Sequence, residues 1–190
     1  MPTKPTHVTA IVLCGGQAQR LGGIDKCLEP INGAAMIDRV LRRLASQVDK
    51  IVISANRNLA SYRERGWPVC QDLPSALPGP LAGVASCLQR VSSERVQLCA
   101  GDTPDLPEDL VQRLLASGPR YPDDGQHGHY LHAQIQRGDI DQLRQGPPPR
   151  SVAAWLTSLG AKPVDFSDAA TCFQNINDPS DLALARKRLT

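Results

Sequence analysis

The feature that most constrains this chain is an apolar run that ends directly in a pair of glycines. Residues 8–14 are mainly Val, Ala, Ile and Leu, and Gly15 and Gly16 follow them. Such a run predicts a buried strand with turn residues at its end. Glycines after a strand often form only a tight turn, but they also let backbone N–H groups approach a ligand without interference from a Cβ atom. The residues that follow decide between these two interpretations.

Two cations in the same stretch favour the ligand-binding interpretation. Arg20 and Lys26 lie on either side of a second glycine pair, Gly22-Gly23. Cations beside backbone N–H groups are typical of a site for an anion, most often a phosphate. The loop is not a Walker loop, because no G-K-[ST] tripeptide exists, and no G-x-G-x-x-G dinucleotide pattern exists either. We therefore expect a different phosphate loop, one that handles a nucleoside triphosphate.

The length and charge of the chain limit what can surround this loop. With 190 residues the chain is long enough for one sizeable core, and we expect a single domain over residues 1–190. The formal net charge of +2 gives no overall field that would favour nucleic acid or a membrane surface. The apolar stretches are shorter than the roughly 20 residues of a membrane span, and the polar start does not resemble a signal peptide. We expect a cytoplasmic protein that binds neither nucleic acid nor membranes.

Neither the cysteines nor the histidines of the chain predict a metal site. None of the six cysteines belongs to a C-x-x-C pair, so we expect free thiols in a reducing compartment. His127 and His129 would share one face of a possible strand, and His132 would lie on the other face. No pattern of carboxylates accompanies these histidines, which disfavours a metal role for them.

The pattern of strands and helices predicts an α/β fold with a mostly parallel central sheet. Apolar strands are expected at residues 50–56, 68–72 and 95–102, in addition to the first one. Helices are expected at 34–47 and 59–65, from Pro80 onwards, and from Thr103 to about residue 117. Successive strand–helix units of this kind form parallel sheets with helices on both faces.

Two aspartates follow predicted strands in the same way as the glycine loop follows the first one. Asp72 and Asp102 stand at expected carboxyl ends of strands, which face one crevice in a parallel sheet. A carboxylate there is a good ligand for Mg²⁺, which takes one or two carboxylates together with phosphate oxygens and water. Either aspartate could instead be a turn or N-cap residue, as is common before Thr-Pro.

The last third of the chain gives weaker patterns. A strand is possible around residues 130–135, and Gly146-Pro-Pro-Pro149 reads as a rigid connector. We expect a helix over 151–159 with Ser151 as its cap. An edge strand at 164–166, a loop at 173–179 and a final helix to about residue 189 complete the prediction.

Several segments, taken together and in order, resemble a known family. Leu13-Cys-Gly-Gly16, Arg20-Leu-Gly-Gly23 and Asp25-Lys26 resemble the signature L-x-G-G-x-x-x-R-M-G-G-x-D-K of molybdenum cofactor guanylyltransferases of the MobA type. The similarity continues in five further segments: Ser54-Ala-Asn-Arg57, Pro78-Gly-Pro-Leu-Ala-Gly83, Cys99-Ala-Gly-Asp-Thr-Pro104, Val164-Asp-Phe-Ser-Asp168 and Asn175-Ile-Asn177. The loop alone would indicate only a broad nucleotidyltransferase superfamily.

The resemblance implies a three-layer Rossmann-like nucleotidyltransferase (GT-A-like) fold and the transfer of GMP from GTP to molybdopterin with Mg²⁺. It divides the chain into a nucleotide-binding half, about 8–117, and an acceptor-side half, about 118–190. It implies nucleotide contacts by Leu13, Cys14, Gly15, Gly16, Lys26, Ser54, Asp72 and Asp102. It implies catalytic roles for Arg20, Lys26 and Asp102, with Asp102 as the metal ligand, and acceptor contacts by Asn175 and Asn177.

The resemblance also implies partners and leaves alternatives open. Other molybdenum-cofactor biosynthesis proteins or molybdoenzyme chaperones could deliver or receive the cofactor, and we expect a monomer or weak homo-oligomer. Three segments depart from the family pattern: Ser54 replaces asparagine, His129-Tyr-Leu131 replaces His-Pro-Thr, and residues 118–125 are polar where an apolar strand is expected. The alternatives are a nucleotidyltransferase that uses CTP or a sugar phosphate, and a GTP-binding relative without catalytic activity.

Overall fold

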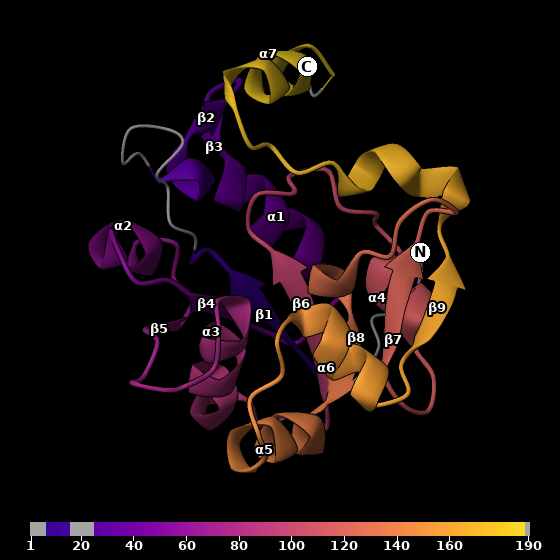
Figure 1. Cartoon of the computed structure of the whole chain (residues 1–190). Helices are drawn as coiled ribbons and strands as arrows, with labels where there is room; N and C mark the ends of the chain where they lie inside the picture. The colour runs from indigo at the N-terminus through magenta and orange to yellow at the C-terminus, as the bar shows by residue number, and fades with distance from the viewer. Residues whose placement is uncertain (1–6, 16–24, 189–190) are drawn as a thin grey trace.

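The computed structural model describes residues 7–15 and 25–188 and confirms the predicted α/β fold. Its described strands form a seven-stranded sheet in the order β5-β4-β1-β6-β8-β7-β9, flanked by helices (Figure 1). The strands are β1 (Val8–Leu13), β4 (Lys50–Ser54), β5 (Val69–Cys70), β6 (Arg95–Ala100), β7 (Arg120–Asp123), β8 (Gln134–Gln136) and β9 (Lys162–Asp165). β5, β4, β1 and β6 are parallel, whereas β8 runs antiparallel to both of its neighbours.

Helices cover both faces of this sheet, as Figure 1 shows. The α-helices are α1 (Met36–Ala45), α2 (Leu59–Arg63), α3 (Pro80–Cys87), α4 (Leu110–Leu114), α5 (Arg137–Gln145), α6 (Val152–Ser158) and α7 (Pro179–Arg188). Short 3-10 helices cover Lys26–Leu28, Leu88–Arg90, Tyr130–His132 and Ser167–Phe173, and a small hairpin joins β2 (Pro30–Ile31) to β3 (Ala34–Ala35). None of the described helices is long and apolar enough to cross a membrane.

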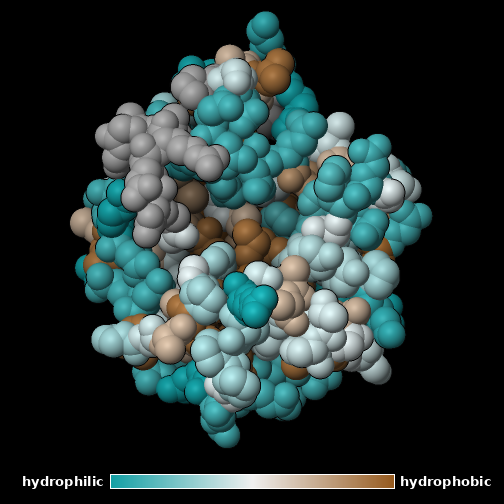
Figure 2. Space-filling model, viewed as in Figure 1, coloured by the Kyte–Doolittle hydropathy of each residue, from teal (hydrophilic) through white to brown (hydrophobic). Residues whose placement is uncertain are grey.

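The first strand, β1, is buried on both faces of the sheet. In β1, Val8, Ala10 and Val12 pack into one core cluster with residues of α1 and α4. Ile11 points to the opposite face and packs with residues of α3, α5 and α6. Because both faces of the strand are buried, its sequence is apolar apart from Thr9 and does not alternate. Figure 2 shows the outside of the molecule as mostly hydrophilic, with hydrophobic residues inside a hollow near the centre of the view.

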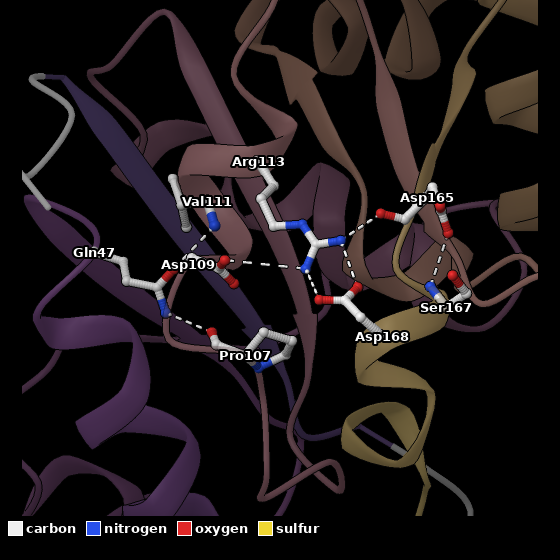
Figure 3. Close-up of polar contacts among 8 residues, drawn as sticks. All are labelled: Gln47, Pro107, Asp109, Val111, Arg113, Asp165, Ser167 and Asp168. Carbon is white, nitrogen blue, oxygen red and sulfur yellow. Dashed lines mark hydrogen bonds and ion pairs between the residues drawn. The ribbon is translucent and has the colours of Figure 1, made fainter.

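The helix predicted from Thr103 to about residue 117 is wrong at both ends, because α4 covers only Leu110–Leu114. Pro104 and Pro107 lie in this segment, and proline disfavours helix before and around it. The buried side chain of Gln47 instead hydrogen-bonds to the backbone on either side of the start of α4. Its Nε2 donates to Pro107 O at 2.9 Å, and its Oε1 accepts from Val111 N at 2.9 Å (Figure 3).

A second correction concerns residues 118–125, where the sequence predicted that the apolar strand is missing. The structure has β7 there, parallel to the edge strand β9 along its whole length. Most of its side chains are only half-buried, so polar residues are tolerated while the backbone forms the ladder. The possible strand at 130–135 is likewise shifted, because Tyr130–His132 is a 3-10 helix and only β8 pairs in the sheet.

Most elements predicted for residues 151–189 are confirmed, but the sequence analysis did not predict α5 or the 3-10 helix Ser167–Phe173. Ser151 caps α6 by accepting a hydrogen bond from Ala154 N at 3.1 Å. The predicted edge strand and final helix are present as β9 and α7. Asp168 forms a bidentate ion pair with Arg113 (Figure 3). The Arg113 guanidinium also lies 3.6 Å from the centre of the Phe166 ring. These contacts join the end of β9 to α4.

Candidate active site

The carboxyl ends of four neighbouring strands carry a row of predicted site residues. Across the sheet order, Asp72 follows β5, Ser54 ends β4, Leu13 ends β1 and Asp102 follows β6. Ligand sites of open α/β sheets lie at this edge. Asp72 and Asp102 are therefore at opposite ends of the row, with the ends of β4 and β1 between them.

A cavity of about 150 Å³ opens beside the end of β1. Leu131, from the second half of the chain, lines it together with residues that mostly follow strand ends of the first half. The full lining is Leu13, Cys14, Gly15, Asp25, Lys26, Cys27, Arg57, Pro80, Ala100, Asp102 and Leu131. Five residues predicted for the nucleotide site thus share one cavity, whereas Gly16 and Arg20 lie outside the described residues.

Lys26 is the electrostatic centre of this cavity. Its Nζ lies 2.8 Å from Asp102 Oδ2 and 2.7 Å from Asn177 Oδ1. The side chains of Lys26 and Asp102 are 22% and 21% exposed, so water reaches the pair only partly. One ammonium group therefore binds oxygens from residues that lie 76 and 151 positions away along the chain.

The loop Asn175-Ile-Asn177 lies directly against the end of β6. Thr103 Oγ1 donates to Asn175 Oδ1 at 2.8 Å, and Ile176 N donates to Asp102 O at 3.1 Å. Ile176 is buried in a small apolar cluster with residues of β2, α1 and α7, which anchors the loop. Both predicted acceptor residues therefore lie beside the predicted metal ligand, although neither lines the cavity itself.

Ser54 and Asp72 form a second group, on the other side of Leu13. A Cβ atom added at Gly83 would lie 2.4 Å from Ser54 Oγ and 3.4 Å from Asp72 Oδ1, so only glycine fits between them. Asn56 Nδ2 donates to Asp72 Oδ2 and Asn56 Oδ1 accepts from Asp72 N, each at 2.8 Å. Asp72 Oδ1 is buried and has no hydrogen-bond partner among the described residues.

Sequence reasoning missed Asn56, Arg57 and Asp25 as site residues. Asn56 clamps Asp72, and Arg57 lines the cavity after β4. Asp25 also lines the cavity and accepts hydrogen bonds from Tyr62 Oη at 2.8 Å and Asn58 Nδ2 at 3.1 Å. The sequence does indicate Asn56 and Arg57 as site residues, because they follow a buried strand in the same way as the glycine loop does.

The thiols at the floor of the cavity are packed rather than reactive. A Cβ atom at Gly101 would lie 2.6 Å from Cys14 Sγ and 2.9 Å from Cys27 Sγ, so this position also requires glycine. Burial raises the pKa of Cys14 well above its ordinary value, with a further contribution from its hydrogen bond with Cys27. Cys14 is therefore a neutral thiol, and its backbone N–H donates to Ser54 O at 2.8 Å.

His127, His129 and His132 do not lie on a strand as predicted, and they do not form a metal-binding cluster. His129 Nε2 lies 2.8 Å from Asp124 Oδ2, and the His129 ring stacks on Phe173 with centroids 4.4 Å apart. Burial lowers the pKa of His132 to about 3, with a smaller contribution from His129. Within residues 7–15 and 25–188, no three His, Cys, Asp or Glu side chains are grouped so as to hold a metal ion.

Two carboxylates, those of Asp25 and Asp102, line the cavity, a number that suits Mg²⁺. Asp102 lines the cavity with one oxygen bonded to Lys26. Mg²⁺ keeps several waters and takes only one or two carboxylates when phosphates supply the remaining oxygens. The donor set therefore fits Mg²⁺ that arrives with a phosphate ligand, and it does not fit a metal that needs an all-protein cage.

Comparison with known proteins gives concordant results. Residues 10–162 match the family model of the MobA-like NTP transferase domain. The chain is 36% identical, over 94% of both chains, to the molybdenum cofactor guanylyltransferase of Yersinia pestis (strain Pestoides F).

Two solved structures share the fold. A molybdopterin-guanine dinucleotide biosynthesis protein A from Archaeoglobus fulgidus has a TM-score of 0.74 at 18% identity, covering 95% of this chain and 98% of its own. A CMP:2-keto-3-deoxy-manno-octonic acid synthetase complexed with CTP has a TM-score of 0.73 at 12% identity, covering 97% and 98%. Because the fold also serves CTP, the fold alone does not specify the nucleotide.

Proposed function

The chain belongs to the molybdenum cofactor guanylyltransferases of the MobA-like NTP transferase family, and from this premise we propose how its site works. The reaction transfers GMP from GTP to the terminal phosphate of molybdopterin, which forms the guanine dinucleotide and releases pyrophosphate. The attacking oxygen and the target phosphorus both belong to anionic groups. The site therefore has to neutralise the phosphate charges and hold the attacking oxygen in line with the bond that breaks.

The observation that carries the proposal is the position of Lys26. An ammonium group has three N–H donors, and among the described residues two of them are directed to Asp102 Oδ2 and Asn177 Oδ1. The third can bind a phosphate oxygen in the cavity. Lys26 would then stabilise the negative charge that develops on the leaving pyrophosphate, while its two protein partners fix its position.

Asp102 is the residue that would hold Mg²⁺. When bound, the metal supplies positive charge to the phosphate oxygens. In our proposal Arg20 adds a second cation, which can grip two phosphate oxygens at once. Backbone N–H groups of Gly15 and Gly16 supply further donors. The acceptor phosphate is already an anionic nucleophile, so the mechanism needs no histidine or cysteine as a catalytic base.

The group around Gly83 would bind the nucleoside. Asp72 Oδ1 is a buried acceptor without a partner among the described residues, and a buried carboxylate oxygen is costly to leave unpaired. A ligand N–H or O–H group would satisfy it. Leu13 and Cys14 line the cavity, and the side chain of Leu13 also lies beside Gly83, as Ser54 Oγ does. Both residues would contact the nucleotide.

The second half of the chain, residues 118–190, would hold the acceptor. Asn175 and Asn177 place amide groups beside Asp102, where the acceptor phosphate has to approach. We further propose that the enzyme acts in the cytoplasm as a monomer or weak homo-oligomer. It would exchange the cofactor with other biosynthetic proteins or molybdoenzyme chaperones.

Pyrophosphate release from GTP, with Mg²⁺ and molybdopterin, tests this function. We expect release that depends on molybdopterin and on Mg²⁺, and little release when CTP replaces GTP. Preference for CTP would assign the site to another nucleotidyltransferase reaction. GTP binding without pyrophosphate release in the presence of molybdopterin would identify a non-catalytic relative.

A further inference from the structure

A buried histidine lies behind the loop that is proposed to bind the acceptor. His132, the last residue of the 3-10 helix Tyr130–His132, is only 3% exposed. Its ring packs at a tilt against Phe173, with centroids 5.5 Å apart. Its backbone carbonyl accepts a hydrogen bond from Gln97 Nε2 at 2.7 Å, which ties the residue to β6. The mechanism proposed above uses no histidine, so this imidazole has no role in it.

His132 is the first member of a relay of three hydrogen-bonded side chains, His132, Thr103 and Asn175. His132 Nε2 lies 3.3 Å from Thr103 Oγ1, and Thr103 Oγ1 donates to Asn175 Oδ1 at 2.8 Å. Thr103 is fully buried and directly follows Asp102, whereas Asn175 is exposed. The relay therefore leads from the core of the protein to its surface, beside the proposed metal ligand.

The direction of the relay follows from the hydrogens that its members carry. A threonine hydroxyl has one hydrogen, and that of Thr103 is given to Asn175 Oδ1. The contact between Thr103 and His132 is then a hydrogen bond only if the ring donates from Nε2. His132 Nδ1 is buried without a partner among the described residues, so this tautomer leaves only a lone pair unpaired there, whereas the opposite tautomer would bury an unpaired N–H group.

This direction fixes which end of the Asn175 amide is left for a ligand. Its oxygen accepts from Thr103, and no described residue accepts from its Nδ2, so both of its N–H groups remain available. Asn177 is held in the same sense, because its Oδ1 accepts from Lys26 Nζ at 2.7 Å. The two asparagines thus have their oxygens occupied and their N–H donors left over. Such donors stabilise an anion, whereas an amide oxygen would repel it.

We propose that His132 is a positioning residue for the acceptor and that it acts through Thr103. By donating to the hydroxyl, the ring makes Thr103 a donor to Asn175, so the amide presents its N–H groups to the terminal phosphate of the acceptor. Without the ring, the hydroxyl and the amide can reverse the bond between them, and the amide oxygen can turn towards the phosphate. The proposal rests on the proposed function where it concerns the acceptor, but the state of the ring can be measured without it.

The ring nitrogens of His132 test the direction of the relay in the protein without substrates. Long-range proton–nitrogen correlation spectra of the full-length protein, isotope-labelled in its histidine nitrogens, distinguish a protonated ring nitrogen from an unprotonated one. His132 is identified among the four histidines by the signals that are missing in His132→Gln. We expect hydrogen on Nε2 and none on Nδ1 at neutral pH. Hydrogen on Nδ1 would reverse the relay and overturn the proposal.

Steady-state pyrophosphate release tests the effect on the acceptor. His132→Leu removes the ring donor at similar volume, and Thr103→Val removes the hydroxyl at similar shape. Each should raise KM for molybdopterin roughly three- to tenfold, the factor for one neutral hydrogen bond, and leave KM for GTP unchanged within about twofold. His132→Gln and Thr103→Ser keep a donor and should return KM for molybdopterin towards wild type. The double variant should be no worse than Thr103→Val alone, because the two residues act in series.

Thr9→Val is a matched control, because Thr9 is also fully buried and its hydroxyl is hydrogen-bonded to Ser93 Oγ at 2.8 Å. Thr9 lies near the start of β1, whereas the proposed site lies at its end, so both KM values should stay near wild type. An unchanged KM for molybdopterin in His132→Leu, or an equal rise for both substrates, would overturn the positioning role. Absence of pyrophosphate release in the wild type would instead count against the proposed function, and the ring spectra would still decide the direction of the relay.

Discussion

Replacement of Asp102 by asparagine distinguishes a catalytic role of the carboxylate from a role in stabilising the fold. The change removes one negative charge and keeps the shape of the side chain. Asparagine still presents an oxygen to Lys26 Nζ, which lies 2.8 Å from Asp102 Oδ2. Ile176 N donates to the backbone carbonyl of residue 102, and that hydrogen bond is unaffected by the side chain. The loop that carries Asn177 should therefore remain in place.

The expected effects on stability and on activity differ in size. The two charged side chains are about one-fifth exposed, and screened pairs of this kind contribute at most about 1 kcal/mol to the free energy of unfolding. If Asp102 is the carboxylate that holds Mg²⁺, turnover should fall at least about 100-fold, which corresponds to roughly 2.7 kcal/mol of transition-state stabilisation. A large loss of turnover with a small loss of stability would identify a catalytic role rather than a structural one.

Asp105→Asn is a matched control, because Asp105 has a similarly exposed side chain and is also ion-paired. It lies 3.7 Å from Arg43 Nη2 and 3.5 Å from Arg188 Nε, and it does not line the cavity. The assay is pyrophosphate release with saturating Mg²⁺, accompanied by urea unfolding of each variant. We expect the control to keep its activity to within about twofold, as surface substitutions usually do. Near wild-type turnover in Asp102→Asn, or an equal loss in both variants, would refute the reasoning.

Three further substitutions, one of them with a matched control, test other parts of the structure. Lys26→Ala should reduce turnover more than tenfold, above about 1.4 kcal/mol, since a charge-assisted phosphate contact is lost; unchanged turnover and GTP affinity would remove Lys26 from the site. Gly83→Ala would place a Cβ atom 2.4 Å from Ser54 Oγ and should lower GTP affinity and cost about 1–3 kcal/mol of stability. Gly138→Ala in α5 meets no atom within 4 Å, so it should leave GTP affinity unchanged and should not lower stability, because alanine favours a helix more than glycine does. The folded protein holds His132 neutral down to a pKa of about 3, while the unfolded chain takes up that proton near pH 6.5. The free energy of unfolding should therefore fall by up to about 1.4 kcal/mol per pH unit below 6.5, and His132→Gln should flatten this dependence between pH 6.5 and 4.5 in urea titrations.

The strands that carry the site were predictable because their environment is simple. β1, β4 and β6 are buried on both faces, so their sequences are apolar runs that end abruptly at polar or glycine residues. Parallel pairing then places their carboxyl ends together, which is how Asp102 could be assigned to the edge near the glycine loop.

The elements that sequence reasoning missed depend on partners from distant parts of the chain. β7 is polar because its side chains are only half-buried, and its pairing with β9 cannot be read from residues 118–125 alone. The short α4 depends on Gln47, whose side chain replaces helical hydrogen bonds near Pro107. The helix α5 buries only Ile140 and Leu143, too few apolar residues to give a clear stripe in the sequence.

Lys26 joins residues from the two predicted halves of the chain. The same ammonium binds Asp102, which follows β6, and Asn177, which lies near the C-terminal end of the chain. A ligand that displaces Asn177 from Lys26 would change how the ammonium is held beside the phosphate cavity. Binding free energies are reciprocal, so a nucleotide that draws Lys26 towards its phosphates would in turn alter the affinity of the Asn175–Asn177 loop for the acceptor. In the proposed mechanism, acceptor binding is therefore coupled to charge neutralisation at GTP through one side chain, without any movement of the sheet.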